Sequence, residues 1–146
     1  METIRGDKEA VRDHIAAAKA VRDRTLVTGV FSDRASSERA YDSLTLRGYR
    51  SNDVDVIMSD QTRREQFGHG STIESGTKVP QGMGVGAKGR VLYSLTAIGV
   101  PENTAIGYWE RIRSGCILMI VRARDADDAD YFVDEWIANE GQDICR

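Results

Sequence analysis

The chain has 146 residues, of which 40% are hydrophobic and 29% are charged, a composition typical of one globular domain or of two small halves sharing a core. Its formal net charge of −3 argues against overall attraction to nucleic acid or to an anionic membrane. Because no apolar run approaches the roughly 20 residues of a membrane-spanning helix, and the charged N-terminus lacks a signal-peptide core, we expect a cytoplasmic protein without a membrane partner.

The N-terminal stretch predicts a helix with a thin apolar face. Val11, Ile15 and Ala18 recur at helical spacing between charged residues. We expect residues 1–24 to form a helical arm that packs on the domain or contacts another subunit, and residues 25–146 to form the domain itself.

The next segment predicts a strand, a helix and a second strand. LVTGVF, residues 26–31, is rich in the β-branched and aromatic residues that favour strands. Ser32 or Asp33 can cap a helix over residues 35–47. VDVIMS, residues 54–59, alternates in the manner of a second strand.

Residues 60–90 are rich in glycine and polar side chains, and they predict one long connecting loop. VLYSLTAI, residues 91–98, is compatible with a strand or a helix, and we favour a helix. Pro101 suits the first turn of a further helix, which Gly115 ends.

The C-terminal part predicts a central strand, a helix and a short edge strand. CILMIV, residues 116–121, is apolar on both faces, as in a buried strand. Asp125 begins the last helix, and DIC, residues 143–145, can add an edge strand. We place four residues on the buried face of that helix: Phe132, Val133, Trp136 and Ile137.

The two cysteines are too few for a disulfide framework. We expect Cys116 to be a core residue at the start of the apolar strand. Cys145 is expected to be a free thiol near the C-terminus.

The two ends of the domain resemble each other. Strand 26–31 with helix 35–47 corresponds to strand 116–121 with helix 127–139. A true repeat and a coincidence between two ordinary strand–helix units are both compatible with the residues. The expected fold is α+β, with a single small mixed β-sheet, helices packed on it, and two pseudo-repeated strand–helix halves joined by the Gly-rich loop 60–90.

Two stretches carry a family resemblance. VTGVFSDRASSERAYDSLTLRGYRSNDVDVIMSD, residues 27–60, pairs a V-x-G-V-F strand with an acidic-capped helix and a D-V-x-V strand. Residues 95–123 hold an L-x-x-x-G-V-P-E turn, a helix with a central aromatic residue, then R-x-G and an apolar strand. In these motifs the chain resembles the bacterial general stress protein domain, also called the heat-induced stress protein domain.

The resemblance implies a bacterial, stress-associated accessory protein, and it supplies no catalytic residues. Members of this family often hold a long Gly/Ala-rich apolar segment between the two halves. Here the corresponding segment is short and polar, and residues 82–89 look like its remnant. This departure argues against association with a membrane.

One candidate ligand site lies in the glycine-rich segment. Gly84, Gly86 and Gly89 spell G-x-G-x-x-G, the pattern of a pyrophosphate-binding turn. Lys88 and Arg90 add positive charge to it. A proline interrupts the stretch before the motif, where the dinucleotide fold needs a strand, so we favour a hinge between the two halves.

A second candidate is a basic patch formed by Arg47, Arg50, Arg63 and Arg64. Such arginines can grip phosphate groups, but few aromatic residues interleave them. We therefore favour a solvated patch or a subunit contact, and we expect no nucleic-acid partner.

The remaining motifs predict no chemistry. The acidic run DADDAD, residues 125–130, lacks the glycine of a calcium loop, and helix capping explains its carboxylates. His14 and His69 belong to no zinc-ligand spacing, and nothing orients the hydroxyl residues near His69 as nucleophiles. We expect no catalytic residue, metal or cofactor.

Two functions from different classes follow. The first is a non-enzymatic, stress-associated accessory protein that acts by self-association, most simply as a homodimer, or by binding an unidentified protein partner. The alternative is a small-molecule or nucleotide-binding module that uses the Gly-rich loop 68–90.

Overall fold

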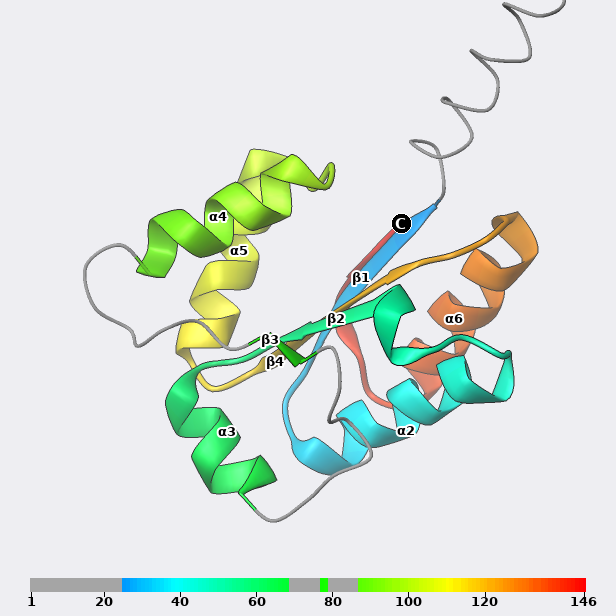
Figure 1. The fold of residues 1–146 in the computed structure, drawn as a ribbon, viewed down its shortest axis with the longest axis horizontal. Coiled ribbons are helices and arrows are strands. Elements are labelled where there is room, and N and C mark those ends of the chain that lie inside the picture. Colours follow the sequence, from blue (N-terminus) through cyan, green and yellow to red (C-terminus); the bar gives the residue numbers. More distant parts are fainter. Residues whose placement is uncertain (1–24, 69–76, 79–86) are drawn as a thin grey trace, which may run out of the picture.

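The computed structural model describes residues 25–68, 77–78 and 87–146, which form five strands and five α-helices (Figure 1). The strands are β1 (Leu26–Phe31), β2 (Val54–Ile57), β3 (Thr77–Lys78), β4 (Ile117–Arg122) and β5 (Gln142–Cys145). The helices are α2 (Arg34–Leu46), α3 (Asp60–Phe67), α4 (Ala87–Ala97), α5 (Glu102–Arg113) and α6 (Ala126–Ala138), and a short 3₁₀ turn, η2 (Ser51–Asp53), precedes β2.

The strands form one mixed sheet in the order β3-β2-β4-β1-β5. β2 pairs with β3 in parallel, and the other three pairings are antiparallel. The two longest strands lie side by side, with Val27 opposite Val121 and Phe31 opposite Ile117. The expected α+β fold with a single mixed sheet is therefore correct.

The connections are split β-α-β units. The chain passes from β1 through α2 to β2, and β4 lies between those two strands. It later passes from β4 through α6 to β5, and β1 lies between those two. This connectivity is the ferredoxin-like topology, with α3, β3, α4 and α5 inserted between its two units. The internal sequence repeat stays a prediction, because matching connectivity does not require matching residues.

One face of the sheet packs against α2 and α6 (Figure 1). Phe31 meets Trp136 edge to face, with 5.6 Å between the ring centroids. Gly29 allows this close approach, because a Cβ at that position would lie 3.2 Å from Trp136 Cε3. The indole Nε1 of Trp136 is buried and has no hydrogen-bond partner among the described residues.

The opposite face packs against α4 and α5, so the molecule has three layers (Figure 1). Val30, Leu118 and Ile120 of the sheet meet Leu95 of α4 and Trp109 of α5 in this second cluster. Each large apolar side chain buried this completely contributes about 1.5–3 kcal/mol of transfer free energy. The fold therefore has two cores, one on each face of the sheet.

Local signals in the sequence set the ends of α2 and α6. Asp33 and Asp125 are the N-caps of these helices. Gly48 follows α2 with φ of 81°, a conformation that favours glycine. Gly141 follows α6, and a Cβ there would lie 2.8 Å from the carbonyl oxygen of Trp136.

The interpretation of residues 60–90 as one long loop is wrong at its two ends, and residues 69–76 and 79–86 lie outside the described residues. α3 occupies residues 60–67 and α4 begins at residue 87, because each stretch can form a helix with part of its surface against the domain. The helix expected over residues 91–98 is confirmed as part of α4. The predicted arm, residues 1–24, lies outside the described residues.

In the C-terminal half, the positions of Cys116 and Ile137 differ from the sequence predictions, and the edge strand agrees with its prediction. Cys116 precedes β4 and is only half-buried, so it is not a core residue. Ile137 is 59% exposed, because it lies on α6 beside the buried Trp136 but on the outer side of the helix. The predicted edge strand is present as β5, and Cys145 is an exposed free thiol.

Candidate functional site

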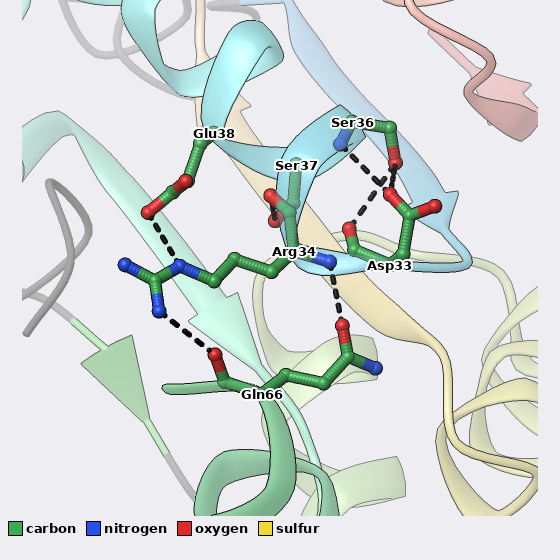
Figure 2. Close-up of polar contacts among 6 residues, drawn as sticks. All are labelled: Asp33, Arg34, Ser36, Ser37, Glu38 and Gln66. Atoms are coloured by element: carbon green, nitrogen blue, oxygen red, sulfur yellow. Dashed lines mark hydrogen bonds and ion pairs between the residues drawn. The ribbon is translucent and has the colours of Figure 1, made fainter. Parts of the chain in front are cut away.

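Polar contacts join the start of α2 to the end of α3 (Figure 2). The carboxylate of Asp33 accepts hydrogen bonds from the backbone N and the Oγ of Ser36, both at 2.8 Å. Arg34 N donates to Gln66 Oε1 at 2.6 Å, and Arg34 Nη1 donates to the carbonyl oxygen of Gln66 at 3.0 Å. Arg34 Nε also donates to Glu38 Oε2 at 2.9 Å. Arg34 therefore fastens α3 to α2.

This turn places two buried serines beside a carboxylate. Hydrogen bonds from the backbone and then from the side chain of Ser36 lower the pKa of Asp33 below its usual 3.8, so the carboxylate stays charged. Ser37 Oγ donates to the carbonyl oxygen of Arg34 at 2.8 Å. Each hydroxyl donates within its own helical turn, an arrangement that caps a helix and does not activate a nucleophile.

A second polar cluster joins the end of α2 to the start of α6. Asp128 is 9% exposed, and its carboxylate accepts from Arg47 Nη1 at 2.7 Å and from Tyr49 Oη at 2.6 Å. Tyr49 Oη accepts in turn from Arg124 N at 2.7 Å. Burial first, and the hydrogen bond to Asp128 second, raise the pKa of Tyr49 to about 12. One acid of the acidic run is thus a buried structural group.

The four arginines of the predicted basic patch do not form one cluster. Arg47 pairs with Asp128, and its guanidinium lies 4.0 Å from the centre of the Tyr131 ring. Arg50 follows the end of α2, whereas Arg63 and Arg64 lie on α3, beside the beginning of α2. The length of α2 separates the two pairs, so a single phosphate-gripping patch is not present in this arrangement.

The structure describes only part of the glycine-rich candidate. Gly84 and Gly86 lie outside the described residues. Lys88, Gly89 and Arg90 form the first turn of α4, and all three are exposed. A helix start carries partial positive charge, which attracts anions. The part that the structure describes is therefore a basic helix start.

A buried tyrosine near β5 was not predicted from the sequence. Tyr108 Oη shares a hydrogen bond with Thr28 Oγ1 at 2.7 Å and donates to the carbonyl oxygen of Asp143 at 2.7 Å. Burial raises the pKa of Tyr108. A cavity of about 80 Å³ lies nearby, lined by residues that include Thr28, Pro101 and Cys145. This volume is well below the roughly 300 Å³ of small-molecule pockets.

The remaining residues that could bind a metal or catalyse a reaction lie partly outside the described residues. Both histidines, His14 and His69, belong to the undescribed segments. Within the described ranges, no group of three His, Cys, Asp or Glu side chains could hold a metal ion. In the same ranges, none of the helices has the length and apolar character needed to cross a bilayer.

Exposed charged residues are distributed differently in the two helical layers. The exposed residues of α2 and α6 include five charged ones, which are Arg39, Asp42, Asp127, Asp130 and Asp134. In the other layer, Glu102 is the only charged residue between Arg90 and Glu110, although 29% of the chain is charged. The middle of the layer formed by α4 and α5 is therefore poor in charge, and the exposed charged residues lie toward the helix ends: Lys88, Arg90, Glu102, Glu110 and Arg113.

We call the exposed uncharged part of this layer the α4–α5 surface: Tyr93, Ser94, Thr96, Ala97, Ile106 and Gly107. The side chain of Tyr93 is 76% exposed and that of Ile106 is 37% exposed. Exposed tyrosine with few charges around it is typical of the core of a protein–protein interface. In the sequence, this surface is indicated by the scarcity of charged residues between Arg90 and Glu110, where only Glu102 is charged.

Exposed apolar residues also occur in the charged layer. Leu46 on α2 is 82% exposed, and Ile137 on α6 is 59% exposed. Each lies among charged or polar neighbours, and single exposed apolar residues are common on protein surfaces. The α4–α5 surface differs from them because its exposed uncharged residues come from two packed helices.

No protein-family model, curated protein or solved structure matches the chain. The resemblance to the bacterial general stress protein domain stays an expectation, carried by the motifs in residues 27–60 and 95–123.

Proposed function

We propose that this chain is a non-enzymatic, stress-associated bacterial accessory protein that acts by self-association or by binding a protein partner. The observation that carries the proposal is the uncharged α4–α5 surface, with Tyr93 76% exposed at its centre. The motifs that resemble the general stress protein domain support the association with stress.

The use of the polar side chains elsewhere also supports an interaction role. The side chains of Asp33, Asp128 and Tyr108 each make two hydrogen bonds, which connect two elements of the fold or cap a helix. These groups hold the framework together. Among the described residues, the surface that we propose for function is the α4–α5 surface.

Site-specific photocrosslinking in the cells that make the chain tests the proposal. A photoreactive amino acid at position 93 should give protein adducts, because Tyr93 lies in the expected interface. The same amino acid at position 46 is the matched control, since Leu46 is similarly exposed but lies in the charged layer. Equal adduct yields at the two positions, or none at position 93, would overturn the proposal.

A small-molecule or nucleotide-binding module is the second candidate. The basic first turn of α4, with Lys88, Gly89 and Arg90, favours an anion there, and the two-residue strand β3 precedes this part of the chain. A nucleotide at 100 times its dissociation constant should stabilise the fold by about 2.7 kcal/mol. Thermal denaturation with a panel of nucleotides and sugar phosphates measures this effect, and Lys88→Ala should abolish it.

A further inference from the structure

We infer that the cavity between β1, the turn that joins α4 to α5, and β5 is a site where hydrogen peroxide oxidises Cys145 to a sulfenic acid. This modification goes beyond the proposed function and does not depend on the α4–α5 surface. Three features support it: the size and lining of the cavity, a β-bulge that turns Cys145 toward it, and the direction of two buried hydrogen bonds.

The cavity is small and combines an apolar wall with a thiol. Its volume is about 80 Å³; Leu26, Val100 and Pro101 form the apolar part of its lining, and Thr28 and Cys145 belong to the polar part. A single water needs about 10–15 Å³ of such space, so a molecule with two oxygen atoms fits, whereas a nucleotide is too large. Because Pro101 and Cys145 are exposed, the cavity opens to solvent. It therefore admits only very small molecules to the side of the thiol.

A β-bulge in β5 directs Cys145 toward this cavity. Gln142 lies opposite Val30 of β1. Three residues later Cys145 lies opposite Thr28, which is only two residues from Val30. Residues three apart in a regular strand point to opposite faces of the sheet. Here Gln142 bonds to Arg111 of α5 and Cys145 lines the cavity at the start of α5, so both lie on the same side. The bulge therefore re-aims the thiol.

The thiol lies beside a buried pair of hydroxyl groups. Residues directly opposite each other in antiparallel strands have neighbouring side chains, so Cys145 is next to Thr28. Thr28 is 3% exposed, and its Oγ1 lies 2.7 Å from Tyr108 Oη. Burial raises the pKa of Tyr108, and the nearby thiol of Cys145 raises it as well. The phenol therefore stays protonated at neutral pH, and the three side chains form one cluster.

The direction of the hydrogen bonds determines what this cluster accepts. Tyr108 has a single hydroxyl proton, which it donates to the carbonyl oxygen of Asp143 at 2.7 Å. In the bond between the two hydroxyl groups, Thr28 is therefore the donor. Thr28 Oγ1 has no further proton to donate, and among the described residues no donor bonds to it besides. A small molecule beside Cys145 is therefore held best when it brings an O–H donor of its own.

Hydrogen peroxide has such a donor, and it oxidises thiols. The thiol of Cys145 loses its proton to solvent, and the sulfur attacks the nearer peroxide oxygen. The S–O bond forms while the O–O bond breaks, and the departing hydroxide takes up a proton to become water. One thiol and one peroxide thus give one sulfenic acid and one water; the sulfur is oxidised by two electrons and the peroxide is reduced. The sulfenic acid also carries an O–H that Thr28 Oγ1 accepts, so the same contact stabilises the product.

Oxidation of the reduced full chain by hydrogen peroxide tests the inference. Sulfenic acid is trapped with dimedone and located by peptide mass spectrometry. It should form at Cys145 about tenfold faster than at Cys116, which is half-buried and is not among the residues that line the cavity. In the chain unfolded by urea the two rates should agree to within about twofold. The rate at Cys145 should be higher in the folded chain than in the unfolded chain, a result that exposure of the thiol alone does not produce.

Thr28→Val separates the site from simple exposure of the thiol. Valine has nearly the shape of threonine but no oxygen, and Tyr108 keeps its bond to Asp143. The peroxide rate at Cys145 should fall about three- to tenfold, which corresponds to the loss of one hydrogen bond. N-ethylmaleimide has no hydrogen-bond donor, so its rate at Cys145 should change less than about twofold. Thr28→Ser, which keeps the oxygen, should retain the wild-type rates. Thr96→Val, the matched control at an exposed position of α4, should also leave both rates unchanged.

Each result supports or overturns the inference. Thr104→Leu fills the cavity from the start of α5 and replaces Thr28→Val if that variant does not fold. It should slow the oxidation of Cys145 severalfold and leave the rate at Cys116 unchanged. The inference is overturned if Cys145 reacts with peroxide no faster in the folded chain than in the unfolded chain. It is also overturned if Thr28→Val leaves the peroxide rate unchanged or slows peroxide and maleimide equally. The proposed function is decided separately, by the crosslink from position 93.

Discussion

At the scale of single residues, Asp33 shows how one carboxylate determines where α2 begins. Replacing it with alanine removes the bonds to the backbone N and the Oγ of Ser36. We expect Asp33→Ala to lower the free energy of unfolding by about 0.5–2 kcal/mol at pH 7. Urea denaturation measures the change. Asp33→Asn, which keeps an acceptor oxygen, should lose less.

The same carboxylate gives a pH dependence with a definite sign. The pKa of Asp33 is lower in the folded chain than its usual 3.8, so the charged form contributes stability above that pH. The contribution is lost as the pH falls through the folded pKa. The stability difference between the wild type and Asp33→Ala should therefore shrink below about pH 4. A difference that is constant from pH 7 to pH 3 would contradict the role given to the charge.

At the scale of elements, α3 depends on polar contacts. Thr62 is its only fully buried residue, Phe67 packs against the core with part of its surface, and Gln66 connects the helix to α2 through Arg34. Gln66→Ala removes the bond from Arg34 N to Gln66 Oε1. We expect it to lower the free energy of unfolding by about 0.5–1.5 kcal/mol and to speed amide hydrogen exchange within residues 60–67.

Gln61→Ala is the matched control for α3. Gln61 lies on the same helix and donates to Glu65 Oε2 at 3.0 Å, but this contact is exposed and lies within α3. Its loss should change stability by less than about 0.5 kcal/mol. If Gln61→Ala and Gln66→Ala have equal effects on hydrogen exchange, the contact with α2 does not hold α3 in place.

α3 also shows what sequence patterns can and cannot predict about elements. α2, α5 and α6 are predictable because apolar residues repeat at helical spacing between clear caps. The stretch DQTRREQF has no apolar face, so it gives no such signal, although Ser59 is a suitable cap. Its partners lie more than 30 residues away, at Arg34. The periodicity of apolar residues cannot predict a helix that is held in place by polar contacts with residues far away in the sequence.

At the scale of the whole molecule, the strands were predictable and their order was not. β1 and β4 pair directly although 85 or more residues separate opposite positions such as Phe31 and Ile117. Composition predicts that each is a strand, but both β-α-β connections are split, so the strands that each helix joins are not neighbours in the sheet. The ion pair between Arg47, after α2, and Asp128, in the first turn of α6, depends on the strand order, because that order places α2 and α6 side by side on one face of the sheet. The sequence grouping of Arg47 with Arg50, Arg63 and Arg64 gives no indication of that contact.

Each core contains a hydrogen-bonded tyrosine, and the ionisation of these tyrosines gives the molecule a predicted alkaline limit. Burial raises the pKa of Tyr49, on the side of α2 and α6, to about 12, and burial also raises that of Tyr108 in the other core. A pKa that is higher in the folded chain than in the unfolded chain contributes stability below the unfolded value, near 10. That stability is lost as the pH rises through the folded value.

The free energy of unfolding should therefore fall as the pH rises from 10 toward 12, while at lower pH the two tyrosines add no slope. Urea denaturation at pH 8, 10 and 11 measures this. Tyr49→Phe should cost about 1–3 kcal/mol at pH 8, because it leaves Asp128 and Arg124 N each without one partner. It should also flatten the alkaline slope, since it removes one of the three tyrosines, with Tyr41 and Tyr108, whose pKa burial raises. Tyr93→Phe is the control, because Tyr93 is exposed and should leave the slope unchanged. A slope that Tyr49→Phe does not alter would show that the buried phenol of Tyr49 does not determine the alkaline limit.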